Sequence, residues 1–188
     1  MTALLLSMAA GIFTSCSDRF TRAAALYEKG ESCNRQGGIE SYLESKEYYK
    51  GAVKLFQKAA KRGNAEAQYR LGVCYEKGKG VEQSYTEAAK WYLRSAKNGR
   101  DWAQNNVAWC YKHGKGVEQS DSLAYKWYRR AAFNGISEAQ FELAWCYDKG
   151  LGVEQSYSEA ARWYRMAAEQ GHASAQCNLG VRYAKGQG

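Results

Sequence analysis

The chain repeats itself every 36 residues over most of its length, and this period restricts the possible folds more than any other feature. The identities that return at this interval include Ala-Gln at 67, 103, 139 and 175, tyrosine at 75, 111, 147 and 183, glycine at 78, 114, 150 and 186, and Val-Glu-Gln-Ser at 81, 117 and 153. A period of this size is typical of arrays in which each copy is too small to bury its own apolar face. The copies are therefore predicted to stack on one another.

Each copy has the spacing of two helices. Small, apolar and aromatic residues recur at the intervals of three and four that mark one face of a helix, first at Ala67, Leu71 and Tyr75 and then at Ala88, Trp91, Tyr92 and Ala96. The first helix is expected to end near Lys77, because Gly78 can adopt the left-handed conformation that closes a helix. The second is expected to start at Ser84, which with Glu87 has the pattern of a capping box. The predicted fold class is all-α, a solenoid of stacked helical hairpins.

This pattern resembles the Sel-one-like repeat family, relatives of the tetratricopeptide repeats. The family pattern is roughly A-x-x-x-L-G-x-x-Y-x-x-G-x-G-V on the first helix and K-A-x-x-W-Y-x-x-A-A-x-x-G on the second, and it matches residues 52–188. The departures are small, with Val107 at a Leu position and Ala108 and Ala144 at a Gly position. The resemblance implies a right-handed α-α superhelix that serves as a scaffold for assembling protein complexes.

The two ends of the array are irregular. The predicted organisation is a signal peptide at 1–15, an irregular repeat at 18–66, full repeats at 67–102, 103–138 and 139–174, and a partial repeat at 175–188. In the irregular repeat, a first helix is expected near Asp18 to Lys29. The segment from Glu31 to Lys46 is either a longer connection or an extended second helix. The last helix either caps the array or begins a further repeat.

The first fifteen residues contain no charged side chain and are rich in Leu, Ala and Met. This apolar segment is too short to span a bilayer but suits the core of an export signal. The tetrapeptide ending at Cys16 resembles a bacterial lipoprotein box, although Phe13 replaces the usual Leu and no basic residue follows Met1. The resemblance implies lipidation of Cys16 and anchoring in the cell envelope, facing the periplasm or the exterior. The alternatives are a secreted or periplasmic soluble protein, or a buried N-terminal helix with Cys16 as a core thiol.

A candidate partner-binding groove follows if the first helices face the hollow of the superhelix, as in tetratricopeptide folds. The positions two before and two after the repeated Leu would then line it: Tyr69, Val73, Asn105, Trp109, Phe141, Trp145, Cys177 and Val181. One turn further on, mixed charges that include Lys112 and Asp148 are expected to rim the groove. A row of aromatic side chains flanked by polar groups is typical of a peptide-binding surface. The alternative is that Trp109 and Trp145 fill gaps between hairpins.

The cysteines and histidines do not form a recognisable catalytic or metal site. Cys74, Cys110 and Cys146 share one repeat position, and stacked helices lie about 8–10 Å apart while a disulfide needs Cα atoms within about 7 Å. These thiols, with Cys33 and Cys177, are expected to be inert and buried. A disulfide such as Cys33 with another thiol, or a reactive thiol, is the alternative. The histidines, His113 and His172, lie at different repeat positions and are expected at the surface, so no metal or cofactor is predicted.

Two further functions remain as alternatives to a protein or peptide scaffold. The related Helicobacter cysteine-rich proteins carry paired cysteines and have been linked to β-lactam hydrolysis, but each full repeat here has a single Cys, so an enzyme is not expected. The net charge of +8 includes a basic stripe at Lys90, Arg94 and Lys97. That stripe is predicted to be a solvated convex face, and a binder of polyanions or lipid surfaces is the alternative. No nucleic-acid partner is expected, and membrane contact is expected only through the lipid anchor.

Overall fold

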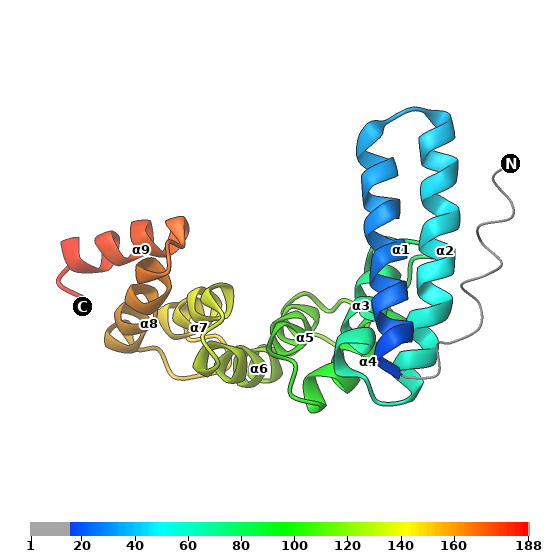
Figure 1. The fold of residues 1–188 in the computed structure, drawn as a ribbon. Helices are drawn as coiled ribbons and strands as arrows, with labels where there is room; N and C mark the ends of the chain where they lie inside the picture. Colours follow the sequence, from blue (N-terminus) through cyan, green and yellow to red (C-terminus); the bar gives the residue numbers. More distant parts are fainter. Residues whose placement is uncertain (1–15, 188) are drawn as a thin grey trace, which may run out of the picture. The chain divides into compact units, whose positions relative to one another are not determined.

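The part of the chain that the structure describes, residues 16–187 of a computed structural model with side chains from residue 18 onward, is all-α (Figure 1). The helices in this part are α1 (Cys16–Gln36), α2 (Ile39–Lys61), α3 (Ala65–Lys77), α4 (Tyr85–Lys97), α5 (Asp101–His113), α6 (Asp121–Phe133), α7 (Ser137–Lys149), α8 (Tyr157–Glu169) and α9 (Ala173–Ala184). They form two compact units, one up to Gln83 and one from Ser84. The predicted signal peptide at 1–15 lies outside the described residues. No described helix has both the length and the hydropathy needed to cross a membrane.

The first unit is built on a long hairpin of α1 and α2. This hairpin shows the conformation of residues 31–46, for which the sequence allowed either a longer connection or an extended second helix. α1 continues past Lys29 to Gln36, and after Gly37 and Gly38 the chain enters α2, so both helices are extended and the connection is tight. Both glycines have positive φ, of 74° and 90°. Aromatic rings hold the hairpin together, with centroids 5.3 Å apart for Tyr27 and Tyr49 and 6.0 Å apart for Phe20 and Phe56.

Helix α3 packs on α2 and ends where the sequence predicts. Asn64 caps its first turn by accepting a hydrogen bond from the backbone N–H of Ala67 at 2.8 Å. The buried side-chain amide of Gln68 donates to the carbonyl oxygen of Ala60, in the last turn of α2, at 3.0 Å. Gly78 follows Lys77 with φ of 66° and ψ of 26°, the left-handed conformation that closes the helix. The predicted end of the first helix is confirmed.

The second unit alternates first helices (α5, α7 and α9) with second helices (α4, α6 and α8). Figure 1 shows the first helices along one side of this unit and the second helices along the other. Each second helix starts at the predicted serine, since Ser84, Ser120 and Ser156 accept from the backbone N–H three residues later at 3.3 Å. Such a cap contributes about 1 kcal/mol because it satisfies a donor that the helix itself leaves unpaired.

The core of the second unit consists of the residues that recur at 36-residue spacing. Tyr128 and Tyr164 are 1% and 0% exposed, and Leu143 and Ala144 are 0% exposed. Alanines at the small-residue positions let neighbouring helices approach closely, and the large rings fill the space between hairpins. The tryptophans of the second helices occupy equivalent positions, with Trp91 and Trp163 buried and Trp127 half-buried.

The repeated Val-Glu-Gln-Ser loop connects the two helices of a hairpin through specific hydrogen bonds. In the second unit the Gln119 amide donates to the carbonyl of Lys112 at 3.1 Å, and the Gln155 amide donates to that of Asp148 at 2.7 Å. Both carbonyls lie in the last turn of a first helix, where intrahelical donors are missing. The loop glutamine thus closes one helix and the following serine starts the next, which explains why the loop sequence returns unchanged.

Candidate functional site

The first helices of the second unit are joined side by side by ion pairs. Lys112 on α5 contacts Glu142 on α7, with Nζ and Oε2 2.6 Å apart. Asp148 on α7 contacts Arg182 on α9, with Oδ1 and Nη1 3.0 Å apart. Each pair is more than half buried, so it loses less energy to solvent screening than an exposed pair would. The three helices therefore present their outer faces on the same side of this unit.

Six of the residues predicted for the groove lie on these three helices. Asn105 and Trp109 come from α5, Phe141 and Trp145 from α7, and Cys177 and Val181 from α9. The first four are half-buried, whereas Cys177 and Val181 are exposed. By contrast, Val107 and Leu143, which lie between the members of each pair in the sequence, are 1% and 0% exposed. The groove positions thus form a surface, and the intervening positions form the core.

The other two predicted residues belong to the first unit. Tyr69 and Val73 lie on α3, four residues apart and therefore on one face of this helix, and both are half-buried. Leu71, which is between them in the sequence, is 0% exposed. The alternation of surface and core positions on α3 is the same as on α5 and α7.

The aromatic groove residues are all half-buried but differ in their ring contacts. The ring centroid of Trp109 lies 4.9 Å from that of His113, and the Lys149 ammonium lies 4.9 Å from the ring centroid of Trp145. Phe141 is more enclosed, because it stacks on His172 at 4.6 Å and also contacts Tyr164 at 5.8 Å. Trp109 and Trp145 therefore have fewer ring contacts than Phe141, which contributes to packing against the start of α9.

Asn105 brings a polar group to the same face as Trp109, one helical turn earlier. Its Oδ1 atom is buried and accepts no hydrogen bond from the residues that the structure describes. A buried acceptor without a donor is costly, by about 1–3 kcal/mol, and is usually paired with water or a ligand. Because this oxygen is buried, a docked peptide can reach it only after the Asn105 side chain rotates.

Asp148 was expected on the charged rim of the groove, and this expectation is wrong. Its side chain is only 4% exposed, and it pairs with Arg182 and, at 3.5 Å, with Lys149. A buried carboxylate is tolerated only when cations or hydrogen-bond donors surround it. The partner on α9 comes from the next repeat, so the pattern within one repeat did not reveal the pair.

The thiols of the repeated cysteine position are poorly suited to nucleophilic chemistry. Burial is the main cause that raises the pKa of Cys74 and of Cys146 to about 12, so both stay protonated near neutral pH. A thiol must lose its proton to act as a nucleophile. No disulfide joins the cysteines of the described residues. The expectation of burial is confirmed for Cys74, Cys110 and Cys146, but Cys33 is half-buried and Cys177 is exposed.

His172 has a structural role that sequence reasoning missed. It was expected at the surface, but it is half-buried and forms the N-cap of α9, where its Nδ1 accepts from the backbone N–H of Ala175 at 3.2 Å. Its ring also stacks on Phe141. His113 is exposed, as expected. The signal was the position of His172 immediately before a predicted helix, where Asn64 stands in an earlier copy and caps α3.

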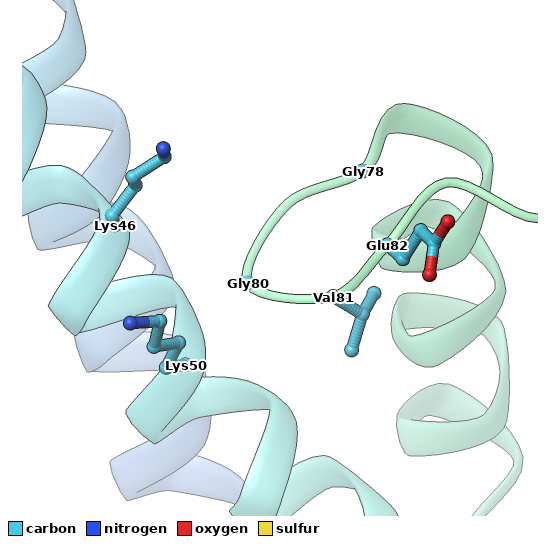
Figure 2. A pocket seen from close by; sticks show the side chains of 6 residues that line it. All are labelled: Lys46, Lys50, Gly78, Gly80, Val81 and Glu82. Atoms are coloured by element: carbon cyan, nitrogen blue, oxygen red, sulfur yellow. The ribbon is translucent and has the colours of Figure 1, made fainter.

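A hollow that the sequence did not indicate lies on the first unit, between α2 and the loop after α3 (Figure 2). Its volume is about 320 Å³, and it is lined by Lys46, Lys50, Gly78, Gly80, Val81 and Glu82. Both lysines already have partners, since Lys50 pairs with Glu47 at 2.6 Å and the Lys46 ammonium lies 4.9 Å from the ring centroid of Tyr42. This engagement makes the hollow a weak candidate for binding an anion.

Comparison with known proteins identifies the repeat. The family model of the Sel1 repeat matches residues 21–64, 65–99, 103–135, 137–172 and 173–188. A comparison with curated proteins gave no match. A Sel1 repeat protein from Oxalobacter formigenes is 32% identical, with a TM-score of 0.75 over 94% of this chain and 69% of that protein.

A second solved structure is similar to the same extent. A protective antigen of uropathogenic Escherichia coli strains, which displays an SLR fold, is 32% identical with a TM-score of 0.74 over 87% of this chain. The chain spans about a third of that antigen's length, since it covers 34% of it. Sel1 repeats are generally protein–protein interaction scaffolds without enzymatic activity. The matched repeats, the all-α hairpins and the two similar structures together show that the chain belongs to the Sel1 repeat family.

Proposed function

We propose that the chain is a non-enzymatic scaffold that binds a peptide segment of a partner protein across α5, α7 and α9. The anchoring residues in this proposal are Trp109 and Trp145, and the half-buried Asn105 belongs to the same surface one turn before Trp109. Cys177 and Val181 extend the surface onto α9, and Tyr69 and Val73 supply an equivalent surface on α3. No catalytic step and no cofactor are involved.

One observation carries the proposal: the aromatic groove residues are accessible although the residues next to them in the sequence are buried. Trp109 and Trp145 are half-buried, while the stacking positions Val107 and Leu143 are 1% and 0% exposed. Large accessible rings are unfavourable in water and are the residues that most often anchor a protein partner.

Replacement of Trp109 by alanine tests the proposal. Peptides selected from a displayed random library against the full chain serve as the probe, and their dissociation constants are measured by fluorescence anisotropy. The variant is expected to bind these peptides at least about tenfold more weakly, because a buried aromatic anchor at an interface contributes more than about 1–2 kcal/mol. Its melting temperature is expected to stay within a few degrees of that of the unchanged chain.

Trp102 on the same helix provides the matched control. It is 39% exposed but does not occupy a groove position, so Trp102→Ala is expected to leave peptide affinity unchanged. If Trp109→Ala instead lowers the melting temperature by several degrees without a specific loss of affinity, the ring fills a gap between hairpins and the groove proposal is wrong. Equal loss of affinity in both variants would also contradict it.

We also propose that Cys16 carries a lipid anchor and that the protein resides at a bacterial cell envelope. The support is the uncharged segment of fifteen residues that ends in small residues just before this cysteine. Mass spectrometry of the N-terminal peptide from bacterial membranes is expected to find cleavage before Cys16 and diacylglycerol on its sulfur. A full-length, unacylated N-terminus in the mature protein would contradict this proposal.

A further inference from the structure

Four basic side chains and one apolar side chain share a hollow at the end of the α1–α2 hairpin where α1 begins. Arg19 comes from the first turn of α1, Lys58 and Lys61 come from the last turns of α2, and Arg62 follows directly. With Leu55 they line an open hollow of about 490 Å³. We call these four cations the basic cluster. None of the residues of the proposed peptide-binding surface belongs to it.

The basic cluster takes no part in the ion pairs of the described residues, although one carboxylate, that of Asp18, precedes Arg19 in the sequence. Three other basic side chains of the same unit have carboxylate partners, in the pairs Lys50–Glu47, Arg70–Glu66 and Lys79–Glu31. No ion pair to a described carboxylate involves any of the four cations of the cluster. The last-turn dipole of α2 favours one or two cations near its C-terminus, but it does not account for Arg19 on the opposite helix. Four unpaired cations around one hollow create a local positive potential that attracts anions.

The hairpin packing holds the two halves of the basic cluster together. Phe20, which follows Arg19, contacts Phe56, which follows Leu55, with ring centroids 6.0 Å apart. Phe56 is 0% exposed, so this contact is part of the core of the first unit. Figure 1 shows the first turn of α1 beside the last turns of α2. The spacing between Arg19 and the lysines of α2 is therefore set by the fold and not by flexible chain.

The position of the basic cluster along the chain indicates what it faces. Cys16 is the first residue of α1, and Arg19 follows one helical turn later, about 4.5 Å along the axis. The fifteen residues before Cys16 are uncharged and apolar. If Cys16 carries a lipid, as proposed above, this end of the hairpin lies at the level of the lipid headgroups. A soluble anion would not require the cluster to lie beside the anchor.

We propose that the basic cluster binds the phosphate groups of anionic phospholipids and so fixes this end of the hairpin on the membrane surface. Acyl chains and nearby basic residues act together in membrane binding, and each basic residue near an anionic surface adds to the affinity. Leu55 supplies an apolar contact in the lining of the hollow. The orientation of the first unit at the membrane is then set by the four cations in addition to the lipid anchor.

The test compares two variants of the full chain that lose the same charge. The cluster variant is Arg19→Gln/Lys58→Gln/Lys61→Gln/Arg62→Gln, and the matched control is Lys77→Gln/Lys97→Gln/Lys126→Gln/Lys185→Gln, which removes exposed lysines from four other places in the chain. Partition onto vesicles is measured by flotation at about 0.1 M salt. One set of vesicles is pure phosphatidylcholine, and the other contains roughly one third phosphatidylglycerol. The preference for the anionic set is the readout, because the lipid on Cys16, like the uncleaved apolar N-terminal segment, binds both sets alike.

In the cluster variant, the ratio of partition onto anionic vesicles to partition onto neutral vesicles is expected to fall at least about tenfold. In the control variant, the same ratio is expected to fall less than about threefold. Equal losses would mean that net charge alone acts and would overturn the proposal. Release of the unchanged chain from anionic vesicles by about 10 mM inorganic phosphate at constant ionic strength would also overturn it, since the site would then take free phosphate. Unchanged circular dichroism and melting temperature confirm that both variants fold. The same comparison on a Cys16→Ser background, which cannot be lipidated, separates the basic cluster from the lipid anchor. The difference between the cluster variant and the control is expected to remain on this background.

Discussion

Replacing Gly116 by alanine is expected to lower the free energy of unfolding by about 3–4 kcal/mol, although the substitution adds a single methyl group. Gly116 has φ of 74°, which costs about 1 kcal/mol or more for any residue with a Cβ atom. An added Cβ would also lie 2.1 Å from the carbonyl oxygen of Tyr85 and 2.6 Å from the backbone nitrogen of Thr86. These atoms belong to the backbone at the start of α4, so no side-chain rotation relieves the clash.

Gly135 separates the two contributions to this prediction. It has φ of 86°, and an added Cβ would meet no atom within 4 Å. Gly135→Ala is therefore expected to cost only the conformational strain, about 1 kcal/mol. Urea denaturation monitored by circular dichroism measures both values. Equal losses for Gly116→Ala and Gly135→Ala would show that the loop does not need its close approach to the preceding helix.

The close contact made by Gly116 recurs at the equivalent glycines of two other repeats. In the first unit an alanine Cβ at Gly80 would lie 2.4 Å from the backbone of Tyr49, and in the second unit one at Gly152 would lie 2.4 Å from that of Asp121. In each case the loop of one repeat lies against a second helix of the repeat before it. The second glycine of the repeated Gly-x-Gly sequence is thus a contact between repeats as well as a turn residue.

Truncation of Trp163 to alanine is expected to have a similarly large effect, about 3–5 kcal/mol of unfolding free energy. Trp163 is 3% exposed, and its ring meets that of Phe133 edge-on with centroids 5.1 Å apart. Phe133 ends the preceding second helix, so the contact joins neighbouring hairpins. Because each repeat contacts only its neighbours, loss of this contact is expected to loosen α8 and α9 first.

Trp102→Ala is the control, because it measures the effect of removing a tryptophan that is not buried between hairpins. Trp102 is 39% exposed and is expected to contribute about 1 kcal/mol. Circular dichroism is the suitable probe, because both substitutions remove a tryptophan fluorophore. Hydrogen exchange of the α8 and α9 amides adds the local readout. If Trp163→Ala were no more harmful than Trp102→Ala, the tryptophan seams would not hold the hairpins together.

Much of the local structure followed from residue types at repeated positions. Gly78 closes α3 and Ser84 caps α4 as predicted, because a left-handed glycine and a serine hydroxyl act on backbone groups a few residues away. The N-cap role of His172 also acts over only three residues, so it could have been predicted from its position before α9, although it was not recognised. The groove positions could be selected in the same way, since helical periodicity alone places Asn105 and Trp109 on one face of α5.

Other features depended on contacts between repeats and were not open to prediction from one copy. Asp148 was expected at the surface, but Arg182 from the next first helix pairs with it and allows it to be buried. Phe141 has the same repeat position as Asn105, yet stacking on His172 gives it a packing role. Cys177 shares that position too, and it is exposed.

The order of helices, their caps, their loops and the core positions of each hairpin are encoded in the 36-residue period, because these features arise from backbone geometry and side-chain periodicity over short distances. The tertiary structure decided which charges are paired and which are left without partners. The basic cluster shows this difference: Arg19 and Lys58 are 39 positions apart in the sequence and face one hollow only because α1 and α2 are antiparallel and packed through Phe20 and Phe56. Electrostatic partners depend on distance in space, which periodicity along the chain does not specify.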